Sequence, residues 1–111
     1  MPEYHPPTHD ELDETHVCAA LDFLVAVEPY PPAESREEYE SAIAPFKRQI
    51  AQAMATLRKF GEQTSPLTLE QLQREYIMLV TLPRYATSPH ALSVVTGALQ
   101  EAWHGVGPWR R

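Results

Sequence analysis

Residues 13–27 read DETHVCAALDFLVAV, and this stretch decides the fold. From Val17 to Val27 nearly every residue is apolar, and Asp22 is the one charged residue. A helix that is apolar on every side is buried on every side. The apolar run is about half as long as a helix that crosses a bilayer, so we expect protein rather than lipid to cover it. Either the other helices of the chain surround it, or a second copy of the protein covers its outer face.

The composition is that of one small soluble domain. The chain has 111 residues, of which 43% are hydrophobic, and both values are ordinary for a single globular domain. Cys18 is the one cysteine, so neither an internal disulfide nor a cysteine-based metal site can form. The N-terminus shows no signal-peptide pattern. These features predict a cytoplasmic protein that does not enter the membrane.

The net charge of -6 is unevenly distributed along the chain. Residues 1–40 hold eleven acidic and one basic side chain, whereas residues 41–111 hold four acidic and eight basic ones. The acidic part repels phosphate backbones, so we expect it not to bind nucleic acid. It can instead receive a basic protein surface. Two other interpretations remain: the acids stabilise helix starts, or the acidic part mimics nucleic acid.

Proline and capping residues mark four helix starts. Thr8–Glu11, Ser35–Glu38 and Thr68–Gln71 each fit a capping box, and Ser88 precedes a proline suited to a first helical position. The sequence therefore predicts an all-α, four-helix bundle-like single domain. Its helices are expected near 9–27, 36–60, 69–82 and 89–104, with an extended N-terminal arm at 1–8 and a C-terminal tail at 105–111.

Two prolines and a glycine bear on the shape of these helices. Pro45 interrupts an apolar seam that continues in phase on both sides, so we predict that the second helix is kinked at Pro45 but continuous. Pro83 is expected to end the third helix. Gly97 lies in the middle of the fourth, where it costs about 1 kcal/mol relative to alanine. Close approach of a neighbouring helix is one explanation for that glycine.

Two short motifs suggest a metal site. Asp13 and His16, like Glu101 and His104, are separated by three positions, so each pair points the same way on a helix. Di-metal carboxylate bundles use this arrangement. An alternative prediction is therefore a metal-binding protein that holds zinc or iron through these four residues. Acids and histidines are also common at helix ends for capping, so a hydrated polar end is the competing interpretation.

Asp22 and Cys18 are two other side chains that could take part in catalysis. Asp22, inside the apolar helix, either pairs with a base such as Arg74 or acts as an acid or base with a raised pKa. Cys18 and His16 are two residues apart and do not face each other on a helix. The sequence has no phosphate-binding loop or serine elbow. It therefore favours a protein that is not an enzyme.

The remaining features favour contact with other proteins. We expect a small interaction module, such as an adaptor, an assembly chaperone, or a regulatory or immunity-type subunit, that forms a homodimer through its first helix. Trp109 precedes two arginines, a composition typical of interface anchors, although it can also fold back onto the core. The residues predicted to make the contact are Val17, Leu21, Leu24, Val25, Tyr30 and Trp109.

Overall fold

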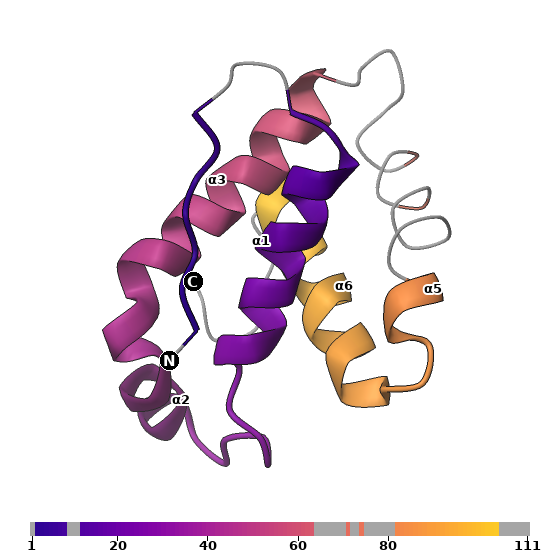
Figure 1. Ribbon diagram of the computed structural model, residues 1–111. Helices are drawn as coiled ribbons and strands as arrows, with labels where there is room; N and C mark the ends of the chain where they lie inside the picture. Colours follow the sequence, from indigo (N-terminus) through magenta and orange to yellow (C-terminus); the bar gives the residue numbers. More distant parts are fainter. Residues whose placement is uncertain (1, 9–11, 64–70, 72–73, 75–81, 105–111) are drawn as a thin grey trace.

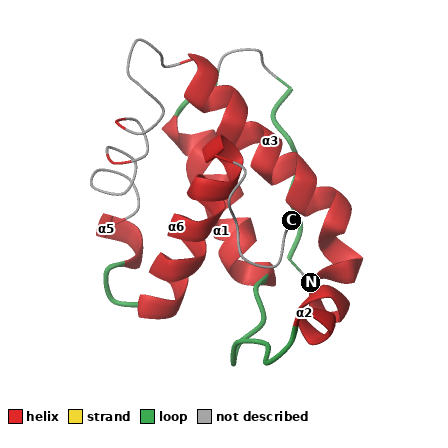
Figure 2. Ribbon diagram, turned by 180° about the vertical axis from the view of Figure 1, so that it is seen from behind, coloured by secondary structure: helices red, strands yellow, loops and turns green. Residues whose placement is uncertain are grey.

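A computed structural model describes residues 2–8, 12–63, 71, 74 and 82–104. Every regular element in these ranges is a helix (Figure 2), so the all-α prediction is confirmed. Most of the predicted helix at 69–82 lies outside the described residues. None of the described helices is long and apolar enough to cross a membrane. The elements are α1 (Glu14–Val27), α2 (Arg36–Ile43), the 3-10 segment η1 (Ala44–Phe46), α3 (Lys47–Gln63), α5 (Leu82–Tyr85) and α6 (Pro89–His104).

Helix α1 occupies the centre of the molecule. It contacts both α3 and α6, which also contact each other, and Figure 1 shows α1 running between them. Leu21 and Leu24 are completely shielded from solvent, and Val17 is nearly so. Helices of the same chain therefore cover the side of α1 that carries these three residues.

The interface prediction needs correction for Val17, Leu21 and Leu24. Their side chains pack into the core of their own chain and present no surface to a partner. The expectation that α1 is buried on every side is also wrong. One strip of α1 is exposed to solvent, and it is made of small or polar residues: Thr15, Ala19, Asp22 and Ala26. Two alanine methyls expose little apolar area, so this strip needs no cover.

Helix α1 begins later than predicted, at Glu14 rather than near residue 9. Asp13 caps it: its carboxylate accepts the N–H of Thr15 at 2.9 Å and that of His16 at 3.3 Å. In return, the Asp13 N–H donates to His16 Nδ1 at 3.0 Å. This reciprocal pair is a capping box built from Asp and His. Residues 9–11 of the predicted box lie outside the described residues.

Two other predicted caps are present. Ser35 Oγ accepts the Glu38 N–H at 3.1 Å, while the Glu38 carboxylate accepts the N–H of Glu34 rather than that of Ser35. Ser88 Oγ accepts the Ala91 N–H at 3.3 Å, and α6 begins at Pro89. The start of α6 therefore matches the prediction in both its cap and its first residue.

The prolines act differently from expectation. The predicted helix at 36–60 is divided into α2, η1 and α3, and η1 contains Pro45. Pro83 lies inside α5, so helical structure reaches Tyr85 instead of ending before Pro83. Proline holds φ near the helical value, which allows a short helical turn to include it.

The N-terminal arm is extended and packs against its own domain. The Tyr4 side chain is buried, its ring centroid lies 5.6 Å from that of Phe23, and its hydroxyl is 2.5 Å from Thr56 Oγ1. The Leu12 N–H donates to Gln63 Oε1 at 3.2 Å. In Figure 1 the arm lies along α3. It therefore covers part of the core between α1 and α3.

Candidate interaction surface

The Asp13–His16 pair, predicted as half of a metal site, forms the cap of α1. His16 Nδ1 accepts the Asp13 N–H and also lies 3.2 Å from the Asp13 carboxylate. One ring nitrogen has one lone pair, so a neutral His16 in this bond carries its proton on Nε2. The lone pair of Nδ1, the nitrogen that faces Asp13, is therefore already occupied by a hydrogen bond from the backbone N–H.

The other two predicted ligands belong to α6. Glu101 is half-buried, and the side chain of His104 lies outside the described residues. Among the residues that the structure describes, no three histidine, cysteine, aspartate or glutamate side chains come together as metal ligands do. The four-residue zinc or iron site stays a prediction.

Asp22 pairs with Arg84 of α5, not with Arg74. Arg84 Nη2 lies 2.5 Å from one carboxylate oxygen of Asp22, and the Tyr85 hydroxyl donates to the other. The hydrogen bond to Asp22, followed by one to Tyr85, raises the pKa of Arg84. Burial, followed by the bond to Asp22, raises the pKa of Tyr85 to about 12. Both oxygens of Asp22 are occupied, so this carboxylate ties α1 to α5 and is poorly placed to act as a base.

Cys18 lies close to this group but is not activated by it. The thiol is half-buried, and burial raises its pKa, although the positive charge of Arg84 partly opposes the shift. The reactive form of cysteine is the thiolate. A thiol with a raised pKa is protonated at neutral pH, so Cys18 behaves as a small apolar side chain.

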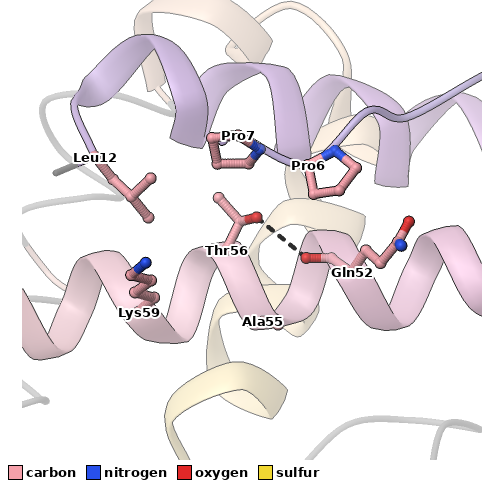
Figure 3. A pocket seen from close by; sticks show the side chains of 7 residues that line it. All are labelled: Pro6, Pro7, Leu12, Gln52, Ala55, Thr56 and Lys59. Carbon is pink, nitrogen blue, oxygen red and sulfur yellow. Dashed lines mark hydrogen bonds between the residues drawn. The ribbon is translucent and has the colours of Figure 1, made fainter. Parts of the chain in front are cut away.

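A shallow depression of about 320 Å³ lies where the arm crosses α3 (Figure 3). The Thr56 hydroxyl at its floor already bonds to Tyr4 and to the Gln52 carbonyl oxygen. The depression is therefore part of the contact between the arm and α3, and the proton of its one buried hydroxyl is already donated to the Gln52 carbonyl oxygen. Its lining consists of Pro6, Pro7, Leu12, Gln52, Ala55, Thr56 and Lys59.

Tyr30 is the one large hydrophobic side chain that is exposed in the described part of the chain, with 77% of its surface accessible. It lies in the loop between α1 and α2, with Pro29 before it and Pro31 after it. Its ring centroid is 4.8 Å from that of His90 in the first turn of α6. The loop therefore holds an aromatic ring against α6 while leaving most of that ring in solvent.

A groove of about 500 Å³ runs along the outer side of α6. It starts at Pro89, which precedes His90, the residue that contacts the Tyr30 ring. None of the described residues that line it is charged. The Thr96 hydroxyl donates to the Leu92 carbonyl oxygen at 2.9 Å, which satisfies its donor inside the helix. We name Tyr30 and the groove together the Tyr30–α6 surface, whose members are Tyr30, Pro89, Leu92, Ser93, Thr96, Gly97 and Gln100.

The groove places Gly97 on the outer side of α6. The residues of α6 that pack into the core are Ala91, Val95, Ala98, Leu99 and Ala102. Gly97 is half-exposed and lines the groove instead. Sequence reasoning considered close helix approach at Gly97 but missed the groove. The available signal was the spacing of Ser93 and Gly97, two small residues four positions apart with no charged residue between them.

The last two predicted contact residues have different outcomes. Val25 is half-buried and packs against the core, so it offers a partner little surface. Trp109 lies outside the described residues. Tyr30 is thus the one predicted contact residue whose described side chain is mostly exposed.

No protein-family model, curated protein or solved structure matches this chain. The function is therefore argued from the geometry alone.

Proposed function

We propose that this protein is a small helical interaction module that binds another polypeptide through the Tyr30–α6 surface. The observation that carries the proposal is the exposure of Tyr30. Tyrosine is enriched among the residues that dominate binding energy at protein interfaces. It combines a large apolar ring with a hydroxyl that can bond to a partner or to water.

The surface is organised for binding. Prolines on both sides of Tyr30 restrict the backbone of the loop, and His90 supports one side of its ring. A side chain held in place loses less entropy when a partner binds. The described residues that line the groove of α6 are uncharged, so a partner covers them without burying an unpaired charge, which would be costly.

The proposed contact lies on α6 and Tyr30, whereas the sequence predicts a contact on α1. The large apolar residues of α1 are used by the core. The uncharged outer side of α6 and the ring of Tyr30 remain accessible. We place the protein in the cytoplasm, with the support of its single, half-buried cysteine.

Two other functions follow from the sequence. A zinc or iron protein rests on Asp13 and His16, which the structure uses as a cap, together with Glu101 and His104. A nucleic-acid mimic rests on the acidic charge of residues 1–40. For neither of these two functions do the described residues offer support comparable with the exposed side chain of Tyr30. The interaction module is therefore the preferred function.

Photocrosslinking in the native host tests the proposal. A photoreactive phenylalanine analogue replaces Tyr30 in one variant and Ser93 in a second. A third variant carries it at Ala51, an exposed position on α3. We expect a discrete crosslinked polypeptide from positions 30 and 93 and much less from position 51. Equal labelling at the three positions, or none at any of them, would contradict the proposal.

A further inference from the structure

We infer that the Tyr30 segment, residues 28–32, of one copy binds the site that Tyr4 occupies in a second copy, in place of the N-terminal arm of that copy. This inference rests on the proposed function and specifies the partner of Tyr30. The Tyr4 site consists of Phe23 of α1 and Thr56 of α3, which contact the ring and the hydroxyl of Tyr4. The arm thus blocks, within each copy, a site that fits a segment of another copy.

The arm is attached to the helices in the manner of a bound peptide. Among the described residues, Tyr4 makes the one hydrogen bond between residues 2–8 and a helix. The other polar contact of the arm joins Glu3 to His5 within the arm itself. No backbone hydrogen bond connects residues 2–8 with the described helices. The arm can therefore be exchanged for another segment without breaking any hydrogen bond inside a helix.

The Tyr4 site is suited to a tyrosine. The Thr56 hydroxyl donates its proton to the Gln52 carbonyl oxygen at 3.1 Å (Figure 3). A hydroxyl has one proton to donate, so the Tyr4 hydroxyl is the donor in its bond to Thr56. The Phe23 ring, 5.6 Å from that of Tyr4, also contacts Phe46 at 6.4 Å. The site thus accepts an aromatic ring that carries a donor at its far end.

The Tyr30 segment shares the chemistry of the arm. Residues 3–7 read Glu-Tyr-His-Pro-Pro, and residues 28–32 read Glu-Pro-Tyr-Pro-Pro. Each segment has an acid, a tyrosine and two final prolines, which favour an extended backbone. They differ in the place of the fifth residue, which follows the tyrosine in the arm and precedes it in the Tyr30 segment. The ring and the hydroxyl that the Tyr4 site contacts are present in both.

The two tyrosines differ in exposure. Tyr4 is 5% exposed, whereas Tyr30 is 77% exposed. Pro31 and Pro32 are exposed as well, and their loop projects from the lower end of the molecule in Figure 1. The loop is therefore accessible to a second copy. Burial of the Tyr30 ring removes apolar surface from water, which favours binding.

Charge also suits the exchange. A depression lies beside the Tyr4 site, and Lys59 is the one charged residue among the described residues that line it. The Tyr30 segment begins with Glu28 and is followed by the exposed Glu34. An acidic segment is attracted to a site that carries a lysine, and this attraction favours encounter of the two copies.

The contact joins two different surfaces, so the copies associate head to tail. In the wild type, the arm competes for the Tyr4 site as a tethered segment, and a tethered segment acts at an effective concentration of about millimolar. Self-association should therefore be weak in the wild type and stronger when the arm no longer fills the site.

Sedimentation velocity of full-length variants tests the inference. Tyr4→Ala empties the Tyr4 site, and we expect self-association at least about 10-fold stronger than in the wild type. Tyr30→Ala in the same background should restore the monomer, although both variants lack the Tyr4 ring. His5→Ala changes an exposed residue of the arm and should sediment as the wild type does. Circular dichroism establishes that each variant is folded.

A synthetic peptide of residues 28–34 tests the contact without a destabilised variant. Added to isotope-labelled wild-type protein, it should shift the NMR signals of Phe23 and Thr56 more than that of Ala51, an exposed position on α3. The same peptide with Tyr30→Phe should bind about 5-fold more weakly, because it cannot donate to Thr56. If Tyr4→Ala is unfolded, the peptide experiment decides.

Three results would overturn the inference: a folded Tyr4→Ala variant that is monomeric at every concentration, self-association that persists without Tyr30, or a peptide that leaves Phe23 and Thr56 unshifted. Failure of this inference and failure of the proposed function are distinguishable. A crosslink from position 30 to a different polypeptide, together with any of these results, contradicts the second copy as partner and keeps the interaction module. Absence of any crosslink at position 30 contradicts both.

Discussion

The Tyr4 hydroxyl and Thr56 Oγ1 lie 2.5 Å apart in the protein interior, although 52 positions separate the two residues in sequence. The Tyr4 ring also contacts the ring of Phe23, and burial raises the pKa of the Tyr4 hydroxyl. The arm thus contributes a core residue of its own, between α1 and α3, and its removal affects stability directly.

Truncation of Tyr4 should destabilise the fold in two steps. Tyr4→Phe keeps the ring and loses the bond to Thr56, which should lower the free energy of unfolding by about 1 kcal/mol. Tyr4→Ala also loses the buried ring, and a loss of about 3–4 kcal/mol is expected. Urea denaturation measures both values. His5→Ala, at an exposed neighbouring position, is the control and should have little effect. A Tyr4→Ala variant as stable as this control would show that the arm does not dock.

Stability should fall at alkaline pH because of Tyr85. Its pKa is about 12 in the folded protein, compared with 10.0 for an ordinary tyrosine. The folded state therefore retains a proton that the unfolded chain releases. The contribution of Tyr85 to stability is complete below about pH 10 and is lost as the pH rises from 10 to 12. Denaturation curves at several pH values should show this decrease.

Phenylalanine variants isolate the contribution of Tyr85. Tyr85→Phe cannot ionise and should reduce the slope of stability against pH between 10 and 12. Tyr30→Phe, at the exposed loop position, is the control for the chemistry of the substitution. Part of the slope should persist in Tyr85→Phe, because burial also raises the pKa of Tyr4. Identical slopes for Tyr85→Phe and wild type would contradict the assignment.

The two partners of Asp22 should differ in importance. The side chains of Asp22 and Arg84 are each nearly half-exposed, so solvent screens their ion pair, and Arg84→Ala should cost less than about 1 kcal/mol. Asp22→Ala also removes the acceptor of the buried Tyr85 hydroxyl, and leaving such a group unsatisfied costs about 1–3 kcal/mol. Thermal denaturation of both variants should therefore rank Asp22→Ala as the less stable. Equal stability of the two variants would mean that the ion pair dominates, because both variants lack it.

Zinc titration tests the metal-binding alternative. Since His16 Nδ1 accepts the Asp13 N–H, we expect one equivalent of zinc to leave the melting temperature of wild type unchanged. The His16→Ala variant should respond in the same way. A rise of several degrees in wild type that disappears in both His16→Ala and Glu101→Gln would instead support the metal site, because a ligand bound by the folded state stabilises it.

Local chemistry made some helix starts predictable and others not. Ser35 and Ser88 each cap the helix expected of them, because a serine and the amides that it satisfies are only three positions apart. The start of α1 was misplaced because Thr8–Glu11 and Asp13–His16 are both able to form a cap. The sequence predicts a kink at Pro45 because of the proline itself, but the 3-10 geometry of η1 has no signature there, since the apolar seam keeps its phase across it.

The candidate site depended on contacts between distant segments. An apolar residue on α1 has the same sequence signature whether its own chain or a second copy covers it, so Val17, Leu21 and Leu24 could not be assigned correctly. The sequence could not tell whether Arg74 or Arg84 pairs with Asp22. Which arginine reaches Asp22 depends on where the chain turns back toward α1. Tyr30, predicted as a contact residue, is exposed in the structure, but its own contact with His90 joins residues 60 positions apart and has no local signature in the sequence.

The docking of Tyr4 also sets an order of events during synthesis. A ribosome makes the arm before α3, and the arm cannot dock until Thr56 has been added and the chain around it has become helical. During that interval Phe23 lacks the ring that later covers it. The arm is thus synthesised before α3 but docks only after it.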